Sequence, residues 1–353
     1  MTEVEIRQGH SVVARVGPTE TEIVVTIAPD EREPVDLRPL AGMPLRSLVL
    51  RRPEGMSSLG ELRAILPPSL PELEVLRVPH AIENWQVLAG YSSLRELDCG
   101  IFTTIESLDW TSCCTLLRVL SINVGGMASI AELGALRSLT SLDLTGYRID
   151  LAPIANLSDL RELRIRGGRG VKGVRKLSAL TSLRVLHLEE LTLADLSIFA
   201  KMTELASLTT LGGVRDAKGL TGLPRLEQVA LNRSTIIDLA PLATIPRLRE
   251  LSLRFSRKLT DLSPLASLVE LRALDLYDAS LPLESLRPLS TLRELRTLNL
   301  SCTSVADREL SPLFGLPLEQ LDIDVVSPRE EASLRAALPA CTIHCSVVAD
   351  PAS

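Results

Sequence analysis

The chain has 353 residues, of which 45% are hydrophobic and only 3% aromatic, so aliphatic side chains carry most of its apolar content. The formal net charge of −6 and the pI of about 5.5 argue against nucleic acid or an anionic membrane as a partner. No apolar stretch reaches the roughly 18 residues of a membrane helix, and the N-terminal residues lack the pattern of a secretory signal. We therefore expect a cytoplasmic protein that binds neither nucleic acid nor membrane.

Residues 1–40 contain three apolar runs, VEIRQG, SVVARV and TEIVVTI, which are separated by Gly-Pro and Pro-Asp turns. Alternation of apolar and polar residues is typical of β-strands with one buried face. We expect a small N-terminal β cap over residues 1–40 that covers the first layer of the structure that follows.

One pattern, LxxLxL, recurs from residue 45 onward. Eight copies are clear, and they begin at Leu45, Leu94, Leu139, Leu160, Leu183, Leu248, Leu271 and Leu295. Five weaker copies begin at Leu73, Leu117, Leu205, Leu226 and Leu318. The first spacing, from Leu45 to Leu73, is 28 residues, and the other eleven lie between 21 and 24. Spacing this regular indicates a stack of about thirteen similar repeats over residues 41–326.

The motif also predicts the structure of each repeat. Positions four and six point to one face of a short strand, and position five points to the other. Parallel stacking of successive repeats, about 4.8 Å apart, buries the leucine face that one strand leaves exposed. Segments between strands, such as DLAPIANL (150–157), place a proline where a short helical or 3₁₀ turn begins. The long first repeat, with EGMSSLGELRAILPPSL, predicts one enlarged outer helix.

The repeat LTSLDLTGYRIDLAPIANL (139–157) resembles the leucine-rich repeat of bacterial internalins, LxxLxLxxNxIxDLxPLxxL. This resemblance implies an α/β solenoid, a horseshoe or arc with a parallel sheet on its concave face and short helical or 3₁₀ segments on its convex face. It also implies protein recognition by the concave side. Position nine departs from the family pattern, because no repeat has the usual Asn there. We expect hydroxyls at Ser234, Ser256 and Thr303 to replace part of its hydrogen bonding.

Residues 327–353 follow the last repeat. SPREEASLRAALPA has the pattern of an amphipathic helix after a Ser-Pro start, and CTIHCSVV has the pattern of a strand. We expect this helix and strand to form a C-terminal cap.

The sequence offers no pattern for catalysis, a metal, a cofactor or a small-molecule substrate. Its four histidines are widely separated, and the HExxH, GxSxG and GxxxxGK[ST] motifs are absent. Six cysteines without a CxxC pair favour reduced thiols. Residues 168–173 read GxGxxG, as in a dinucleotide fingerprint, but the repeat spacing leaves no room for the crossover helix, so we expect turn glycines.

A basic stretch forms a secondary candidate site, for an anion or an acidic partner. Its residues are Arg161, Arg164, Arg166 and Arg169. Stacking of the strands also puts Arg164 beside Asp143. It puts Arg166 beside Glu189, so ordinary cross-strand ion pairs are the alternative interpretation.

The main candidate for partner binding comprises positions seven and eight of three consecutive repeats. These residues are Asn232, Arg233, Arg254, Phe255, Tyr277 and Asp278. Aromatic residues and Arg are enriched at binding hot spots, and this chain has few aromatics. Position five extends the surface with a polar, acidic floor of Asp275, Asn299 and Asp322. In the alternative interpretation, Phe255 tucks under the turn and Tyr277 shields it. Trp85 and Trp110 fall in outer segments, where core packing is expected.

These observations predict a non-catalytic protein–protein interaction module, or scaffold, whose partner is a protein of unknown identity. An inhibitor or immunity-type protein that blocks an enzyme is a second hypothesis, and the sequence does not separate the two. A GTPase-activating regulator that uses an exposed Arg is a third.

Overall fold

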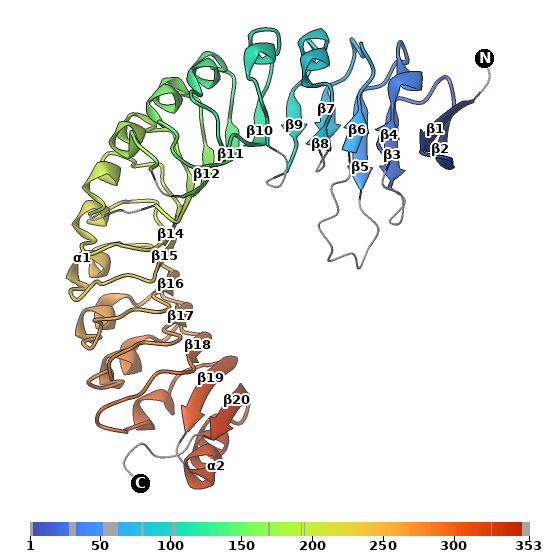
Figure 1. The fold of residues 1–353 in the computed structure, drawn as a ribbon. Coiled ribbons are helices and arrows are strands. Elements are labelled where there is room, and N and C mark those ends of the chain that lie inside the picture. The colour runs from blue at the N-terminus through green and yellow to red at the C-terminus, as the bar shows by residue number, and fades with distance from the viewer. Residues whose placement is uncertain are drawn as a thin grey trace. The chain divides into compact units, whose positions relative to one another are not determined.

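The computed structural model describes residues 3–27, 33–51, 63–78, 81–100, 104–168, 170–191, 193, 195–325 and 327–347. The chain forms two compact units, residues 1–180 and 181–353. In both units, each LxxLxL motif forms a strand that begins two residues after its first leucine. Within each unit these strands line one side and short helical segments line the other (Figure 1).

The first unit contains a parallel sheet that follows the chain order. Its strands are β3 (Glu22–Thr26), β5 (Ser47–Arg51), β7 (Val75–Arg77), β9 (Glu96–Asp98), β10 (Val119–Asn123), β11 (Ser141–Gly146) and β12 (Glu162–Gly167). A short 3₁₀ segment precedes β9, and another follows each strand from β9 to β12. These segments are η2 (Trp85–Gly90), η3 (Asp109–Ser112), η4 (Ala131–Ala135), η5 (Ala152–Asn156) and η6 (Val174–Ala179). Leu120, Leu142 and Leu163 lie side by side in register, as the repeat spacing predicts.

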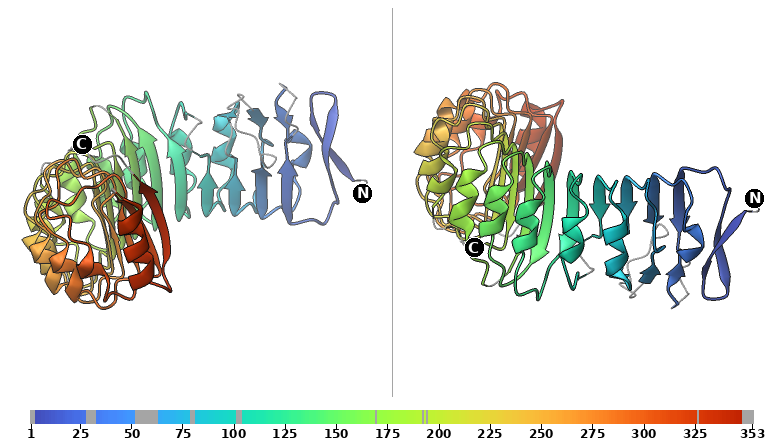
Figure 2. Two further views of the ribbon diagram at one scale, coloured as in Figure 1. Left: turned by 90° about the horizontal axis from the view of Figure 1, so that it is seen from below. Right: turned by 90° about the horizontal axis from the view of Figure 1, so that it is seen from above.

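A second, smaller sheet lies in the first unit. Its order is β2 (Ser11–Val16), β1 (Val4–Gln8), β4 (Val35–Asp36), β6 (Arg63–Ile65) and β8 (Ala81–Ile82), with η1 (Arg38–Leu40) after β4. Strand β1 pairs antiparallel with both neighbours, and the other pairs are parallel. Figure 2 shows the β1–β2 hairpin beside the N-terminus. The three predicted N-terminal strands are therefore present, and β3 joins the sheet of the repeats.

The enlarged outer helix predicted between Leu45 and Leu73 is wrong for its described part. Arg63–Ile65 forms strand β6, in which Ala64 is buried and pairs with Val35 and Ile82. Pro67 and Pro68 follow directly and remove the N–H groups that a helix would use. Residues 52–62 lie outside the described residues.

The second unit is a parallel sheet in chain order. Its strands are β13 (Val185–Glu189), β14 (Ser207–Leu211), β15 (Gln228–Asn232), β16 (Glu250–Ser252), β17 (Ala273–Asp275), β18 (Thr297–Leu300), β19 (Gln320–Val325) and β20 (Thr342–Val347). The segments that return the chain are η7 (Ser197–Phe199), η8 (Lys218–Leu220), α1 (Ala240–Ala243), η9 (Ser263–Ser267), η10 (Arg287–Thr291) and η11 (Ser311–Leu313). Helix α2 (Pro328–Ala337) precedes the last strand.

Sequence explains why the returns are short helices. Several begin with a proline in their first turn, as η5, α1, η9, η10 and η11 do, where its missing N–H is not needed. An Asp just before the turn accepts a hydrogen bond from a backbone N–H two residues on. The Asp261 Oδ1 atom accepts from Ser263 N at 2.7 Å, and Asp238 Oδ1 accepts from Ala240 N at 2.8 Å. The predicted helical or 3₁₀ returns are confirmed.

The core is a stack of leucine layers. In one repeat, Leu271, Leu274 and Leu276 at positions one, four and six are at most 1% exposed. Full burial of one such side chain stabilises a fold by about 1.5–3 kcal/mol. Trp85 and Trp110 are 6% and 3% exposed, so their predicted packing in the core is confirmed.

Hydroxyl groups replace the missing Asn at position nine of the later repeats. The Ser256 hydroxyl donates to the Leu253 carbonyl at 2.5 Å and lies 3.4 Å from the Ser234 hydroxyl. The Thr303 hydroxyl donates to the Leu276 carbonyl at 2.6 Å and accepts from the N–H of Ala279 at 3.0 Å. All three hydroxyl residues are buried, so the predicted substitution is confirmed.

The C-terminal segment forms the expected helix and strand. The Ser327 side chain caps α2 by accepting a hydrogen bond from the N–H of Glu330 at 3.3 Å, and β20 pairs with β19. In the described part of the chain, no helix is both long enough and apolar enough to cross a bilayer. The boundaries of the two predicted caps, at residues 40 and 327, stay predictions.

Candidate functional site

The eighth position of the later repeats has an unusual backbone. Six consecutive repeats place a residue with positive φ there: Glu190 (59°), Gly212 (112°), Arg233 (55°), Phe255 (58°), Asp278 (54°) and Cys302 (58°). The N–H of each of the first five donates to the position-seven carbonyl of the next repeat, as from Phe255 to Tyr277 at 2.8 Å. Left-handed backbone is costly for a bulky side chain such as Phe, and such strain is often found at functional sites.

An aromatic–arginine cluster lies on this row and comprises Arg233, Arg254, Phe255 and Tyr277. The Phe255 and Tyr277 rings meet edge to face, with centroids 5.4 Å apart and an interplanar angle of 78°. The Arg254 guanidinium carbon lies 4.9 Å from the Tyr277 centroid and 5.7 Å from that of Phe255. The Arg233 guanidinium carbon lies 5.6 Å from the Phe255 centroid. These are cation–π distances, so the cluster orders itself before any partner arrives.

Polar groups hold the cluster from below. Asn232 Oδ1 accepts hydrogen bonds from the Ser252 hydroxyl at 2.8 Å and from the N–H of Arg254 at 3.1 Å. Asp275 Oδ1 accepts from the N–H of Tyr277 at 3.0 Å, and Asp275 Oδ2 lies 3.7 Å from Arg254 Nε. The predicted site residues Asn232 and Asp275 therefore position the backbone and the guanidinium of the cluster.

In the alternative interpretation, Phe255 tucks under its turn and Tyr277 shields it, and the contact between the two rings agrees with the shielding. Phe255 and Tyr277 are half-buried, and the residue buried in the turn is Ser256. The Cys302 thiol raises the pKa of the neighbouring Tyr277 phenol above its usual value. The two rings of the cluster are therefore in contact with each other and in part exposed.

The predicted acidic floor is present as one row across adjacent strands. Asp275, Asn299 and Asp322 are register partners on β17, β18 and β19. The row continues to His344 on β20, whose Nδ1 lies 2.6 Å from Asp322 Oδ1. Sequence reasoning missed His344, although extending the strand register by one more repeat places it there.

Comparison with solved structures places this arrangement among known folds. An internalin (inlF) of Listeria monocytogenes aligns over 89% of this chain and 91% of its own, with a TM-score of 0.58 and 21% identity. A protein of Leptospira interrogans described as an LRR protein aligns over 92% and 89%, with a TM-score of 0.62 and 18% identity. The chain has the leucine-rich-repeat fold. The predicted fold class is thereby confirmed.

A plant member of this fold is also similar. The leucine-rich-repeat ectodomain of the receptor kinase GASSHO1/SCHENGEN3 from Arabidopsis thaliana aligns over 89% of this chain and 43% of its own, with a TM-score of 0.60 and 18% identity. That structure is a complex with CASPARIAN STRIP INTEGRITY FACTOR 2. No family model matches the sequence, and no curated protein matches it either.

The basic stretch lies in the leucine-rich repeats of the first unit. Arg166 NH1 lies 2.5 Å from Asp143 Oδ1, an ion pair between β12 and β11. Arg164 lies beside Asp143 in register, as predicted, and its NH1 is 3.9 Å from Glu162 Oε2. Arg169 is outside the described residues. The contact of Arg166 favours the cross-strand ion-pair interpretation for this residue.

The GxGxxG segment after β12 is a turn. Gly170 and Gly173 have φ angles of 86° and 75°, and Gly173 directly precedes η6. A Cβ at Gly173 would lie 2.3 Å from Asp150 Oδ1, so the neighbouring repeat leaves no room for a side chain. The predicted role as turn glycines is confirmed.

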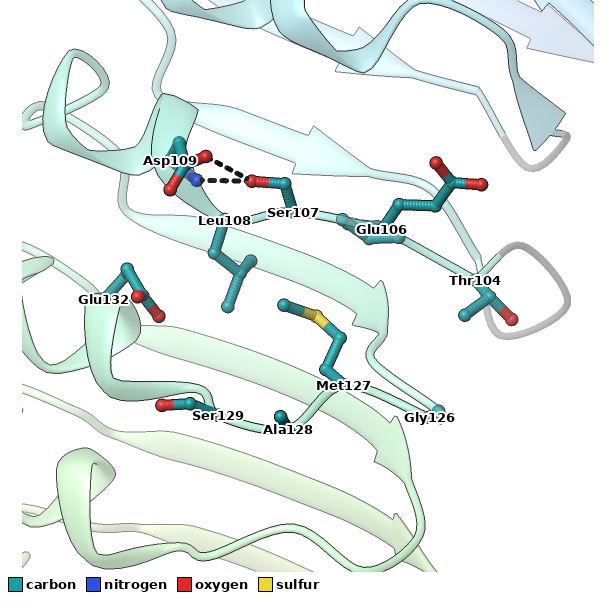
Figure 3. A pocket seen from close by; sticks show the side chains of 12 residues that line it. Thr104, Glu106, Ser107, Leu108, Asp109, Gly126, Met127, Ala128, Ser129 and Glu132 are labelled. Carbon is teal, nitrogen blue, oxygen red and sulfur yellow. Dashed lines mark hydrogen bonds between the residues drawn. The ribbon is translucent and has the colours of Figure 1, made fainter.

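A hollow of about 490 Å³ opens between two loops of the first unit. Figure 3 shows Leu108 and Met127 facing each other across it, with Glu106 and Glu132 at its two sides. The Ser107 hydroxyl bonds the carboxylate of Asp109 at 2.8 Å and accepts from its N–H at 3.1 Å, which fixes the start of η3. This hollow was not predicted from the sequence, because most of its lining comes from irregular loops.

No three His, Cys, Asp or Glu side chains among the described residues gather around a possible metal position. All six cysteines are unbridged. Burial raises the pKa of Cys114 to about 11 and that of Cys99 well above its usual value, which makes both thiols poor nucleophiles.

Proposed function

We propose that this leucine-rich-repeat protein is a non-catalytic interaction module that binds a protein partner through the aromatic–arginine cluster and the adjoining floor of Asp275, Asn299 and Asp322. The carrying observation is the cluster itself, where two arginines stack on two half-buried aromatic rings. Pre-ordered Arg and aromatic side chains are the residues that most often dominate binding energy. A stable interface would bury on the order of 1,600 Å².

A solved structure with the same fold supports the proposal that the partner is a protein. The plant receptor ectodomain with the same fold was solved in complex with CASPARIAN STRIP INTEGRITY FACTOR 2. The chain offers an extended sheet on which an edge row of charged and aromatic side chains recurs from repeat to repeat. We also propose that the protein acts in the cytoplasm, in keeping with six unbridged cysteines, two of them fully buried.

Affinity capture tests this function. Wild-type chain and the double variant Arg254→Ala/Tyr277→Ala are used as bait in native lysate, and captured proteins are crosslinked and quantified. The wild type is expected to capture one dominant partner, and the double variant about a hundredfold less of it, since two hot-spot residues contribute roughly 2 kcal/mol or less each.

A matched control removes the same residue types elsewhere. Arg247→Ala/Tyr147→Ala deletes an exposed Arg on the opposite edge of the same repeat and a Tyr that is 51% exposed in the first unit. This control should retain capture. Equal capture by wild type and the Arg254→Ala/Tyr277→Ala variant, with both folded by circular dichroism, would refute the assignment. If the captured partner is an enzyme and this chain inhibits its activity, that result would support the inhibitor hypothesis over simple scaffolding.

A further inference from the structure

A pocket opens on the outer side of the aromatic–arginine cluster. Its volume is about 470 Å³, and it is lined by Arg233, Phe255, Arg257, Asp278 and Ser280. These residues occupy positions eight and ten of three consecutive repeats. The repeat therefore builds the pocket, because each position ten lies next to the position eight of its own turn. We call it the arginine pocket.

The backbone around the arginine pocket has no hydrogen-bonding capacity to spare at its N–H groups. Those of Arg233, Phe255 and Asp278 donate to carbonyls of the next repeat, at 2.8, 2.8 and 3.0 Å. Those of Arg257 and Ser280 donate to the preceding repeat, at 3.2 and 3.1 Å. Recognition in the pocket must therefore come from side chains.

The two guanidinium groups determine which side chain fits. The Arg233 guanidinium carbon lies 5.6 Å from the centroid of the Phe255 ring, and a guanidinium carries its N–H groups in its own plane. Those in-plane groups match the two oxygens of a carboxylate. Arg257 is exposed and lines the same pocket, so two positive groups face one negative group, Asp278. The apolar Phe255 wall lowers the local dielectric and strengthens the attraction.

We infer that the arginine pocket takes an Asp or Glu side chain from an acidic segment of the protein partner. This inference rests on the proposed function and specifies the chemistry of its partner. A polyphosphate chain fits less well, because the carboxylate of Asp278 lines the pocket itself. Asp278 repels a continuous line of negative charge more strongly than the single charge of one acidic side chain.

A capped peptide tests the inference directly. The probe is a fluorescein-labelled hexapeptide of one Glu and five Gln with an amidated C-terminus, titrated into the full chain at 50 and 200 mM NaCl and followed by anisotropy. Arg233→Gln and Arg257→Gln should each weaken binding by about fivefold, the scale of one exposed ion pair. Asp278→Asn should strengthen it by a similar factor, and higher salt should weaken it. Arg247→Gln, on the opposite strand edge, should change nothing.

Three further arms decide between sources of negative charge. Hexaglutamine should not bind, and equal binding of it would overturn the inference. Binding that requires a free C-terminal carboxylate on the peptide would assign the pocket to chain termini and contradict the Asp or Glu assignment. Tighter binding of a twelve-nucleotide single-stranded DNA, lost in Arg233→Gln, would assign the pocket to nucleic acid and also contradict it.

Capture of the partner by two different double variants distinguishes a failure of this inference from a failure of the proposed function. If Arg254→Ala/Tyr277→Ala abolishes capture while Arg233→Gln/Arg257→Gln leaves it unchanged, the interaction surface stands and the carboxylate pocket is refuted. If neither variant affects capture, the proposed function itself fails.

Discussion

The first and later repeats share one inner strand but differ in how the chain returns to it. The first three return segments contain the short strands β4, β6 and β8, which pair into a second sheet, and the 3₁₀ segments η1 and η2 follow β4 and β8. From η3 onward the return segments contain short helices, and lateral pairing among the described residues is limited to single bridges such as Leu283 with Val305. Pairing between repeats and hydrogen bonds within a turn both satisfy backbone groups on the return side. LxxLxL therefore determines the inner half of a repeat, and local residues determine the outer half.

The same difference separates the edge rows. In the later repeats, position eight is left-handed in six successive turns, which brings Arg233, Phe255 and Asp278 into one row. In the last three repeats of the first unit, no residue at position eight has a positive φ, position nine holds Gly125, Tyr147 and Gly168, and the Tyr147 ring lies over Gly125 and Gly126. Only a regular edge can align side chains of successive repeats into a continuous binding surface.

Truncation of an inner leucine has the largest expected effect and should be alike in both regions. Leu48 and Leu298 both occupy position four and are 0% exposed. Leu48→Ala and Leu298→Ala should each lower the free energy of unfolding by about 3 kcal/mol, measured by urea denaturation. A cost below about 1 kcal/mol for Leu48→Ala alone would mean that the early repeats do not share the leucine core.

Replacing an edge residue by Gly instead of Ala should change the stability of the fold in opposite directions in the two regions. Phe255 has a φ of 58°, whereas Val124, at the same position of an early repeat, is not among the residues with positive φ. Phe255→Gly should be about 1 kcal/mol more stable than Phe255→Ala, because Ala pays for left-handed backbone and Gly does not. Val124→Gly should be less stable than Val124→Ala by about 0.5–1 kcal/mol. The same sign at both positions, in thermal unfolding, would contradict the backbone difference.

Acid should erase the contribution of the Asp residues that start the later turns. Hydrogen bonds from the side chain and N–H of Ser263 hold the pKa of Asp261 below its usual value, and Ser285 does so for Asp307. A lowered folded-state pKa means stability that is present above the unfolded value, about 3.9, and is lost as the pH falls through the folded value. Asp261→Ala should cost about 1 kcal/mol at pH 7, and the gap from wild type should close below about pH 3. A gap that widens in acid would refute this role.

Thiol labelling compares the reactivity of an exposed and a buried cysteine, one in each region, and needs no substitution. Cys302, beside Tyr277, is exposed, whereas Cys99 is 0% exposed. An aqueous thiol reagent should modify Cys302 in the native protein and Cys99 only after unfolding. Mass spectrometry of the labelled peptides gives the result, and rapid native labelling of Cys99 would show that its leucine layer is open.

The sequence predicted the stack because near-constant leucine spacing leaves few other ways to bury those side chains. It also predicted the Ser234, Ser256 and Thr303 substitution and the row from Asp275 to Asp322, since register follows from the spacing. It did not predict β6, because pairing with β4 and β8 depends on residues far apart in the chain. The sequence did not predict Arg257 as a site residue, because its place beside Arg233 depends on the left-handed turn. The residues Arg233, Phe255 and Asp278 in that turn do not indicate left-handed backbone.

Hydrogen exchange of the chain with and without its captured partner tests the central claim most directly. The account predicts that protection increases in the peptides that span residues 228–280 and 297–325, with no change in residues 104–168. The amides of Arg233, Phe255 and Asp278 mark the row, because each is bonded to the next repeat and reports closure of the edge. Protection confined to the first unit, with residues 228–280 unchanged, would contradict the assignment of the binding surface.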